Sequence, residues 1–361
     1  MTGSLKGSLF GEGVRGVASF EGTGTYIVHS KATSFLESGR DTWVAGPKTP
    51  VDAECGCRLT ESSYVIVGSD SGHNVLEYSI TSKEWEPVDR WPEMRTKRKG
   101  PGCAATQTYL LVAGGVTNQG EVLASVEIIW LQSRSLSRGR DMSSPRSFFN
   151  LVPVGLVRPK ILAVGGRFGT SFLKSTEFWD EEENRWEEGP ELGTGRSSFG
   201  TLMIQDDFAC TTNLESHPPQ SGQATETAAP LMNTQPTGLE LLFFCGEIFI
   251  YSRVLNLQPS PGHVAVGGWD NIAVLTRVDI FPLPSCSVNT ALCSIPQLPR
   301  PRLDHSLSLL PGGKMVVCGG RDFDYNSGQF YTLSTCISWA TGDSRWKDFS
   351  DMRCVVMLNK S

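Results

Sequence analysis

The sequence has few charges and no long apolar run. Only 19% of its 361 residues are charged and the formal net charge is −6, so we expect no nucleic-acid partner, because phosphate binding requires clustered Lys and Arg. No stretch approaches the roughly 18 consecutive apolar residues that a membrane span needs. Residues 1–10, expected to be flexible, also lack the apolar stretch of a secretory signal. We therefore expect a cytoplasmic protein, with an extracellular one as the alternative if the N-terminus is truncated.

Metal-binding and catalytic patterns are also scarce. The chain has five His without paired spacing, whereas copper needs converging ligands. His305 is expected to be a structural strand residue. Gly11-Glu-Gly13-Val-Arg-Gly16 matches a dinucleotide motif but is not followed by a predicted helix. Asp322-Phe-Asp324-Tyr-Asn326 has alternate oxygen ligands, yet no Glu closes a calcium loop. We expect no metal, no cofactor and no catalytic residue.

Ten cysteines leave two interpretations open. Cys55 and Cys57 form one close pair and Cys286 and Cys293 another, while Cys318 and Cys336 are expected to face each other from neighbouring strands. An extracellular protein would oxidise such pairs, whereas a cytosolic one keeps them as buried thiols. The missing secretory signal favours thiols, and disulfides are the alternative.

A short apolar run that ends in two glycines recurs along the chain. The clear copies end at Gly114-Gly115, Gly165-Gly166, Gly267-Gly268 and Gly319-Gly320. A degenerate copy, with one glycine, ends at Gly68. Successive copies lie about 50 residues apart, or about twice that between the second and third clear copies, which is the period of a propeller blade. Glycine allows the positive φ and close backbone approach that such a strand end needs.

A second set of markers has the same period. Tryptophan occurs late in the units, and a basic residue opens the next unit. The tryptophans are Trp43, Trp85, Trp186 and Trp346, and the basic residues are Arg95, Arg146, Arg196, Arg302 and Arg353. We predict that the tryptophans fill the gaps between neighbouring units.

The clearest unit contains four short β-rich runs, at 146–154, 160–166, 175–179 and 185–190, bounded by turn formers. Together with the Gly-Gly, Trp and Arg markers, this pattern resembles the kelch-repeat family. The resemblance implies an all-β chain, a kelch-type β-propeller of about six or seven four-stranded blades over residues 11–358.

The repeat fails between residues 207 and 262, which contain neither Gly-Gly nor Trp. This segment is either an insertion within a blade or a decayed blade. We favour an insertion, because the residues before and after the segment together form one complete repeat unit, and insertions usually occur in loops. An insertion gives six blades, and a decayed blade gives seven.

The loops after each Gly-Gly are expected to emerge on one face. They carry Val116, Asn118, Arg167, Phe168, Trp269, Asp270, Arg321 and Asp322. Exposed Arg and aromatic side chains are typical of interface hot spots, although Phe168 and Trp269 could instead pack between blades. The expected function is a non-catalytic scaffold that binds a protein or peptide. The resemblance also allows a propeller enzyme of the galactose-oxidase or sugar-epimerase type, and a secreted kelch protein with disulfides.

Overall fold

The computed structural model describes a chain built almost entirely from β-strands. It describes residues 14–20, 22–68, 75–154, 160–204, 241–244, 247–250, 262–270, 272–282, 295–310, 313–340 and 342–351. Over these ranges the one helical element is the 3-10 turn η1 (Val88–Arg90). No helix in the described part of the chain is long and apolar enough to cross a membrane.

The strands form successive antiparallel units, each running outward in chain order. The first unit comprises β1 (Gly16–Phe20), β2 (Gly24–Val28), β3 (Thr33–Glu37) and β4 (Trp43–Ala45), and the second comprises β5 (Ala53–Thr60), β6 (Ser63–Gly68), β7 (Val75–Ser79) and β8 (Glu84–Trp85). These two units share one eight-stranded sheet, because β1 pairs in parallel with β5.

The later units repeat this order in separate sheets. The third comprises β9 (Gly102–Ala105), β10 (Tyr109–Ala113), β11 (Val126–Trp130) and β12 (Leu136–Gly139); the fourth comprises β13 (Asn150–Val154), β14 (Lys160–Val164), β17 (Thr176–Asp180) and β18 (Arg185–Glu188). The fifth comprises β19 (Gly200–Ile204), β22 (Gly262–Val266) and β23 (Val278–Pro282); the sixth comprises β24 (Ser306–Leu310), β25 (Lys314–Cys318), β28 (Thr335–Trp339) and β29 (Lys347–Asp351). Two small hairpins, β15 (Arg167–Phe168) with β16 (Ser171–Phe172) and β26 (Arg321–Asp324) with β27 (Gln329–Thr332), follow the second strands of the fourth and sixth units.

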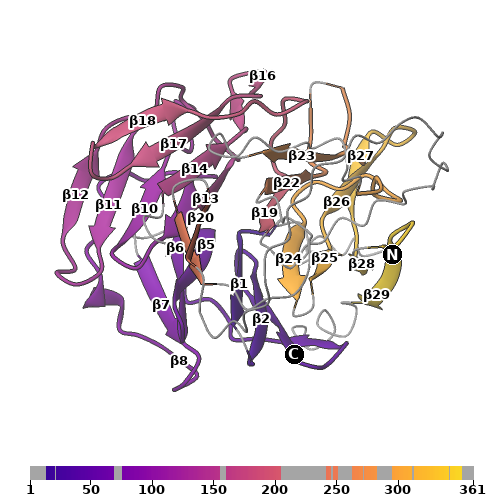
Figure 1. The fold of residues 1–361 in the computed structure, drawn as a ribbon, viewed down its shortest axis with the longest axis horizontal. Helices are drawn as coiled ribbons and strands as arrows, with labels where there is room; N and C mark the ends of the chain where they lie inside the picture. The colour runs from indigo at the N-terminus through magenta and orange to yellow at the C-terminus, as the bar shows by residue number, and fades with distance from the viewer. Residues whose placement is uncertain are drawn as a thin grey trace, which may run out of the picture.

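The units close into a ring around their first strands. β1, β5, β9, β13, β19 and β24 contact one another in this order, and β24 in turn contacts β1. Figure 1 shows β1, β5, β13, β19 and β24 towards the middle of the molecule and β12, β18 and β29 at its periphery. The all-β propeller predicted from the sequence is therefore confirmed, and the described units are consistent with about six blades.

Hydrophobic cores lie between neighbouring units rather than inside single sheets. One core packs Tyr109 and Leu111 of the third unit against Ile161 and Trp179 of the fourth. The closing joint is equally apolar, since residues of the first and sixth units share one buried cluster. Its buried members are Ile27, Leu36, Trp43, Val316, Cys318 and Cys336. A blade buries its faces only by stacking on its neighbours, as expected for this architecture.

Three of the late tryptophans bridge neighbouring units. Trp85, Trp186 and Trp346 each donate Nε1–H to a carbonyl in the segment that enters their unit from the preceding one. The acceptors are Lys48 O at 2.9 Å, Arg140 O at 2.9 Å and Pro296 O at 2.7 Å. The indoles therefore tie neighbouring units together at the periphery of the ring.

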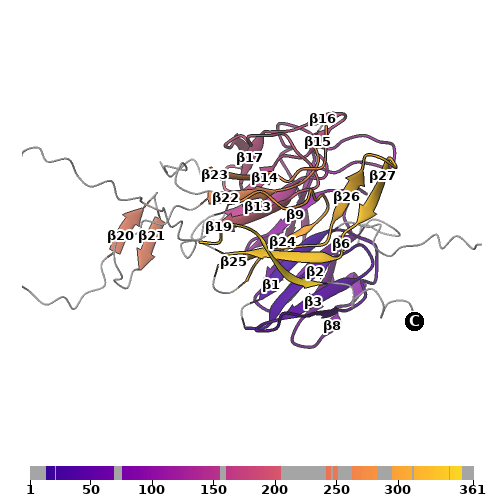
Figure 2. The ribbon, with the colours of Figure 1, turned by 90° about the vertical axis from the view of Figure 1, so that its right-hand side faces the viewer.

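The segment 207–262 lies mostly outside the described residues. Its flanks pair directly, because Gly200 lies opposite Val266 and Ile204 opposite Gly262 in the β19–β22 ladder. Inside it, β20 (Leu241–Phe244) and β21 (Glu247–Ile250) pair only with each other, and Figure 2 shows them apart from the other strands. Residues 1–10 and Arg353 also lie outside the described part.

Of the cysteine pairs expected from the sequence, the structure contains one and lacks another. Cys318 and Cys336 are opposite each other on β25 and β28 and form a disulfide, as their expected juxtaposition allows. Cys55 does not pair with Cys57. It forms a disulfide with Cys103, linking the first strands of the second and third units across a Cα–Cα distance of 6.0 Å. Cys57, two residues further along β5, is a free thiol. Cys286 and Cys293 lie outside the described residues.

Candidate interaction face

A buried arginine opens each of the third to sixth units and binds the end of the second strand of its own unit. The guanidinium Nη1 atoms of Arg98, Arg146, Arg196 and Arg302 donate to the carbonyls of Gly114, Gly165, Gly267 and Gly319 over 2.8, 2.8, 2.9 and 2.9 Å, respectively. Arg95, the residue predicted for this position, is exposed and does not occupy it. The prediction was wrong because the turn between the first two strands is shorter in the third unit than in the fourth, which moves the arginine closer to its Gly-Gly.

Three of these arginines pair with a carboxylate on the third strand. Arg98 donates to Glu127 over 2.6 Å, Arg146 bonds Glu177, and Arg196 bonds Asp279. The sequence analysis missed these acids. Strand register could have revealed them, since each lies opposite the residue two places before its Gly-Gly.

The sixth unit has Ile337 where the others have the acid. Its arginine, Arg302, instead donates to the Thr335 hydroxyl and carbonyl. Burial and, to a smaller extent, the charge of Arg300 lower the pKa of Arg302 to about 10.

The Gly-Gly pairs have the geometry predicted from the sequence. Both members of each pair in the third to sixth units have positive φ, for example 58° at Gly165 and 98° at Gly166. In the third to fifth units the second glycine donates its N–H to the carbonyl of the arginine that opens the next unit, over 2.8 Å from Gly166 to Arg196. A Cβ on Gly165 would lie 2.9 Å from that carbonyl oxygen. The strand end therefore tolerates only glycine.

In three joints an aromatic ring from the next unit packs on the first glycine. Phe149 and Phe199 take this place in two joints, and His305 takes it against Gly267. Burial and, to a smaller extent, the charge of Arg302 lower the pKa of His305 to about 3. His305 is therefore a buried structural residue of the joint, and it lies directly before β24 rather than within a strand as expected.

The loops that follow the glycines share one geometry. The residue after each Gly-Gly forms an antiparallel bridge to the residue after the opening arginine. The bridges join Lys99 with Val116, Ser147 with Arg167, Ser197 with Trp269, and Leu303 with Arg321. Because every second strand ends at the same side of the ring, these four positions lie on one face, which we call the Gly-Gly face.

A chain of backbone hydrogen bonds connects the units on this face. The N–H groups of Phe148, Ser198, Asp304 and Val14 donate to the carbonyls of Gly100, Phe148, Ser198 and Asp304, respectively, over 2.8 to 3.0 Å. These acceptors have φ near +55°, within the left-handed region. The face is thus a fixed platform from which the loops project.

The predicted loop residues differ in how accessible they are in the third and fourth units. Val116 is half-buried and Asn118 is exposed. Arg167 is exposed, with its guanidinium carbon 4.8 Å from the centre of the Phe148 ring. Phe168 is 50% exposed, so it does not fold back between blades. Arg167 and Phe168 are therefore available to a partner.

The fifth and sixth units use their predicted residues partly for internal contacts. Trp269 is half-buried, with its ring 5.2 Å from that of Phe330. Asp270 accepts from the N–H groups of Ile272 and Ala273. The Arg321 guanidinium is bound to Asp304, and the buried Asp322 accepts from the Tyr331 hydroxyl over 2.7 Å. These four residues therefore mainly make contacts within the protein. They are less accessible to a partner than Arg167 and Phe168.

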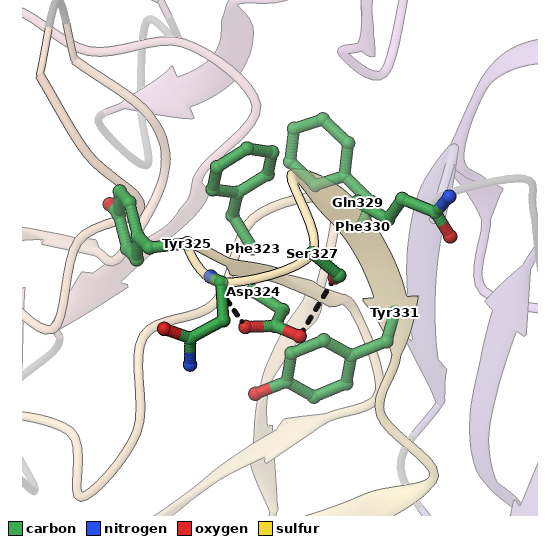
Figure 3. A pocket seen from close by; sticks show the side chains of 8 residues that line it. Phe323, Asp324, Tyr325, Ser327, Gln329, Phe330 and Tyr331 are labelled. Carbon is green, nitrogen blue, oxygen red and sulfur yellow. Dashed lines mark hydrogen bonds between the residues drawn. The ribbon is translucent and has the colours of Figure 1, made fainter.

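Aromatic residues that the sequence analysis did not select extend the Gly-Gly face. Tyr325 is 65% exposed, and Phe330 and Tyr331 are each 43% exposed. All three belong to the β26–β27 hairpin, which lines a pocket of about 560 Å³ shown in Figure 3. The hairpin is longer than its β15–β16 counterpart. The extra residues after Gly320 are visible in the sequence, and they could have revealed this hairpin.

The calcium-like pattern forms the turn of this hairpin. Asp324 accepts from Asn326 N over 2.9 Å and from Ser327 Oγ over 2.7 Å, as drawn in Figure 3. These bonds lower the pKa of Asp324. The described residues contain no group of three His, Cys, Asp or Glu placed to hold a metal ion.

Comparison with known proteins gives one match. The family model of the kelch motif matches residues 151–193, which span β13 to β18 of the fourth unit, and a search of curated proteins finds no match. The matched segment contains the Gly-Gly end, the paired aromatic strands and the late tryptophan that recur around the ring. The fourth unit therefore matches the kelch motif, and the neighbouring units repeat its Gly-Gly strand end.

Proposed function

We propose that this kelch propeller is a non-catalytic interaction module that binds a protein or peptide through the loops of the Gly-Gly face. One observation carries the proposal. Of the six large apolar side chains that are exposed in the described part of the chain, five lie in loops of this face: Phe168, Ile272, Tyr325, Phe330 and Tyr331. Exposed apolar side chains gathered on one surface mark an interaction site, whereas scattered ones need no explanation.

The chemistry of the loops supports binding rather than simple exposure. Tyr, Trp and Arg are the side chains that most often carry interface energy. Arg167 lies over the Phe148 ring, so less of its conformational freedom is lost when a partner binds. The backbone bonds between units hold the loops in place, which lowers the same cost.

Affinity capture with loop variants tests the proposal. The bait proteins are the wild type, an Arg167→Ala/Phe168→Ala double variant, and a Glu181→Ala control. Glu181 is an exposed residue in the β17–β18 turn of the same unit, at the opposite end of its strands. Loss of two hot-spot side chains should weaken binding by about tenfold or more, so a bound partner should fall in the double variant alone. Equal recovery of every partner by all three proteins would refute the choice of face.

A further inference from the structure

The hairpin strand β27 lies at the edge of a two-stranded sheet. It pairs with β26 on one side, and no other described strand pairs with it. All four of its residues, Gln-Phe-Tyr-Thr, are exposed. Natural proteins protect such edges with charges, proline or bulges, and β27 has none of these. An unprotected edge is a template for pairing with another chain.

The hairpin register directs backbone groups of Phe330 towards the outer edge of β27. Leu333 N–H donates to Gly320 O just beyond the ladder. Hydrogen-bonded and non-hydrogen-bonded pairs alternate in an antiparallel ladder, so the Asp322–Tyr331 pair is hydrogen-bonded and the Phe323–Phe330 pair is not. The N–H and C=O of Phe330 therefore point outward, as those of Arg321 do on the other side of the hairpin, where they bond to Leu303.

The two faces of the hairpin differ in chemistry. Phe330 lies on the same face as Phe323, with ring centres 5.0 Å apart, and Trp269 of the fifth unit packs against both rings. The opposite face carries Tyr331 and Asp324. Figure 3 shows the two phenylalanine rings on one side of the hairpin and Asp324 with Tyr331 on the other.

The polar face is acidic. Asp322 and Asp324 lie in β26 on the same face, two residues apart, as alternate strand residues do. Both accept hydrogen bonds from within the hairpin. Neither forms an ion pair with a cation in the described ranges. A basic side chain laid along this face would meet two carboxylates, the half-buried Asp324 and the buried Asp322 beneath it, of which Asp322 also interacts with the charge of Arg302.

We propose that an extended segment of a partner protein adds to β27 as a further strand, with apolar side chains over Phe330 and Lys or Arg side chains towards Asp322 and Asp324. Main-chain hydrogen bonds to Phe330 would supply affinity, and the alternating faces would supply specificity. This inference rests on the proposed function and names the class of partner segment at one part of the Gly-Gly face.

The test uses a blocked, fluorescent peptide in which valine and lysine alternate, with binding followed by fluorescence anisotropy. Two control peptides have the same composition: one groups the valines and lysines in blocks, and one carries N-methyl groups on its backbone. The alternating peptide should bind at least about tenfold more tightly than either control, because only it offers both the ladder and the matching faces. Equal binding of the alternating and N-methylated peptides would overturn strand addition.

Variants of the whole chain locate the site. An Asp322→Asn/Asp324→Asn protein should bind the alternating peptide about tenfold more weakly, while the Glu181→Ala control should bind it as the wild type does. Slower amide exchange at 329–332 in the peptide complex is a second readout that does not depend on these substitutions. Undiminished binding by the Asn variant together with unchanged exchange would exclude β27.

Two further outcomes separate this inference from the proposed function. If wild-type protein sediments as a dimer that the Phe330→Ala substitution dissociates, a second copy occupies the edge and the inference is wrong. If the Arg167→Ala/Phe168→Ala substitutions abolish partner capture while no peptide binds β27, the proposed function stands and strand addition fails. If neither surface binds anything, both fail.

Discussion

At the scale of single residues, the joints between units depend on buried arginines. Arg146 is fully buried and satisfies two carbonyls and a carboxylate at once. A buried charge of this kind is stable only while its partners remain, since removing one leaves the other uncompensated. The arginine also holds the strand end from which the binding loop starts. Stability of the joint and position of the loop therefore have the same cause.

Replacing Glu177 by Gln tests this account of the joint. The change removes the carboxylate but keeps the shape, so the guanidinium of Arg146 stays buried without its counter-charge. We expect the free energy of unfolding to fall by about 3 kcal/mol, measured by urea denaturation. Glu181→Gln, in an exposed turn, should change it by less than about 0.5 kcal/mol. Equal small effects of both changes would contradict the role given to the ion pair.

His305 gives a pH dependence with a defined sign. Its pKa is about 3 in the folded protein against 6.5 in an unfolded chain, so its contribution to stability is complete above pH 6.5. Between pH 6.5 and about 3 the unfolded chain binds a proton that the folded protein does not, and stability falls. His305→Phe introduces the residue type that fills this place in other joints.

Between pH 7 and 4.5 the wild type should lose about 2–3 kcal/mol more than the His305→Phe variant. Urea denaturation at the two pH values measures the difference, because the other titrating groups are common to both proteins. Parallel losses in the two proteins would show that His305 is not held neutral by the fold.

At the scale of elements, the sequence pattern predicted the strands and the Gly-Gly turns because both depend on local chemistry. Glycine at positive φ and apolar runs of strand length are visible in any single unit. The partners of the buried arginines were not predicted, since the contact between Arg146 and Glu177 depends on strand register across 31 positions. Arg98 was missed for a similar reason, as a shorter turn shifts it relative to the marker.

The candidate site shows the same division. Loop positions such as Arg167 and Phe168 followed from the repeat, because every unit places its loop at the same side. The aromatic hairpin did not, since Tyr325, Phe330 and Tyr331 lie in an extension that the repeat does not contain. The inward use of Arg321 and Asp322 also needed the structure, because their partners Asp304 and Tyr331 become neighbours only after folding.

At the scale of the whole molecule, the ring is closed by β24 against β1 and by an apolar core between the first and sixth units. Closure packs each innermost strand beside the first strands of its two neighbours, which shields these edges from pairing with another chain. The loops of the Gly-Gly face therefore project from a closed ring. The outer edge of β27 lies in one of these loops and is not covered by this packing.

The Cys55–Cys103 disulfide should stabilise the ring, because it links two neighbouring units through cysteines that are 48 residues apart in the chain. We expect Cys103→Ser to lower the free energy of unfolding by about 3 kcal/mol. Cys57→Ser should have a smaller effect, since Cys57 is a free thiol whose pKa burial raises to about 12. Alkylation of the denatured, unreduced protein followed by peptide mapping checks the pairing. Modification of Cys55, Cys103, Cys318 and Cys336 would contradict it, and modification of all ten cysteines would also exclude the secreted alternative.

Hydrogen–deuterium exchange with a bound partner tests the central claim, that the Gly-Gly face is the binding surface. The account predicts slower exchange in the loops of this face, at 116–122, 167–172, 269–275 and 321–332, and no change in the turns at 131–136 and 180–185 on the opposite face. Slower exchange confined to those opposite turns would contradict it.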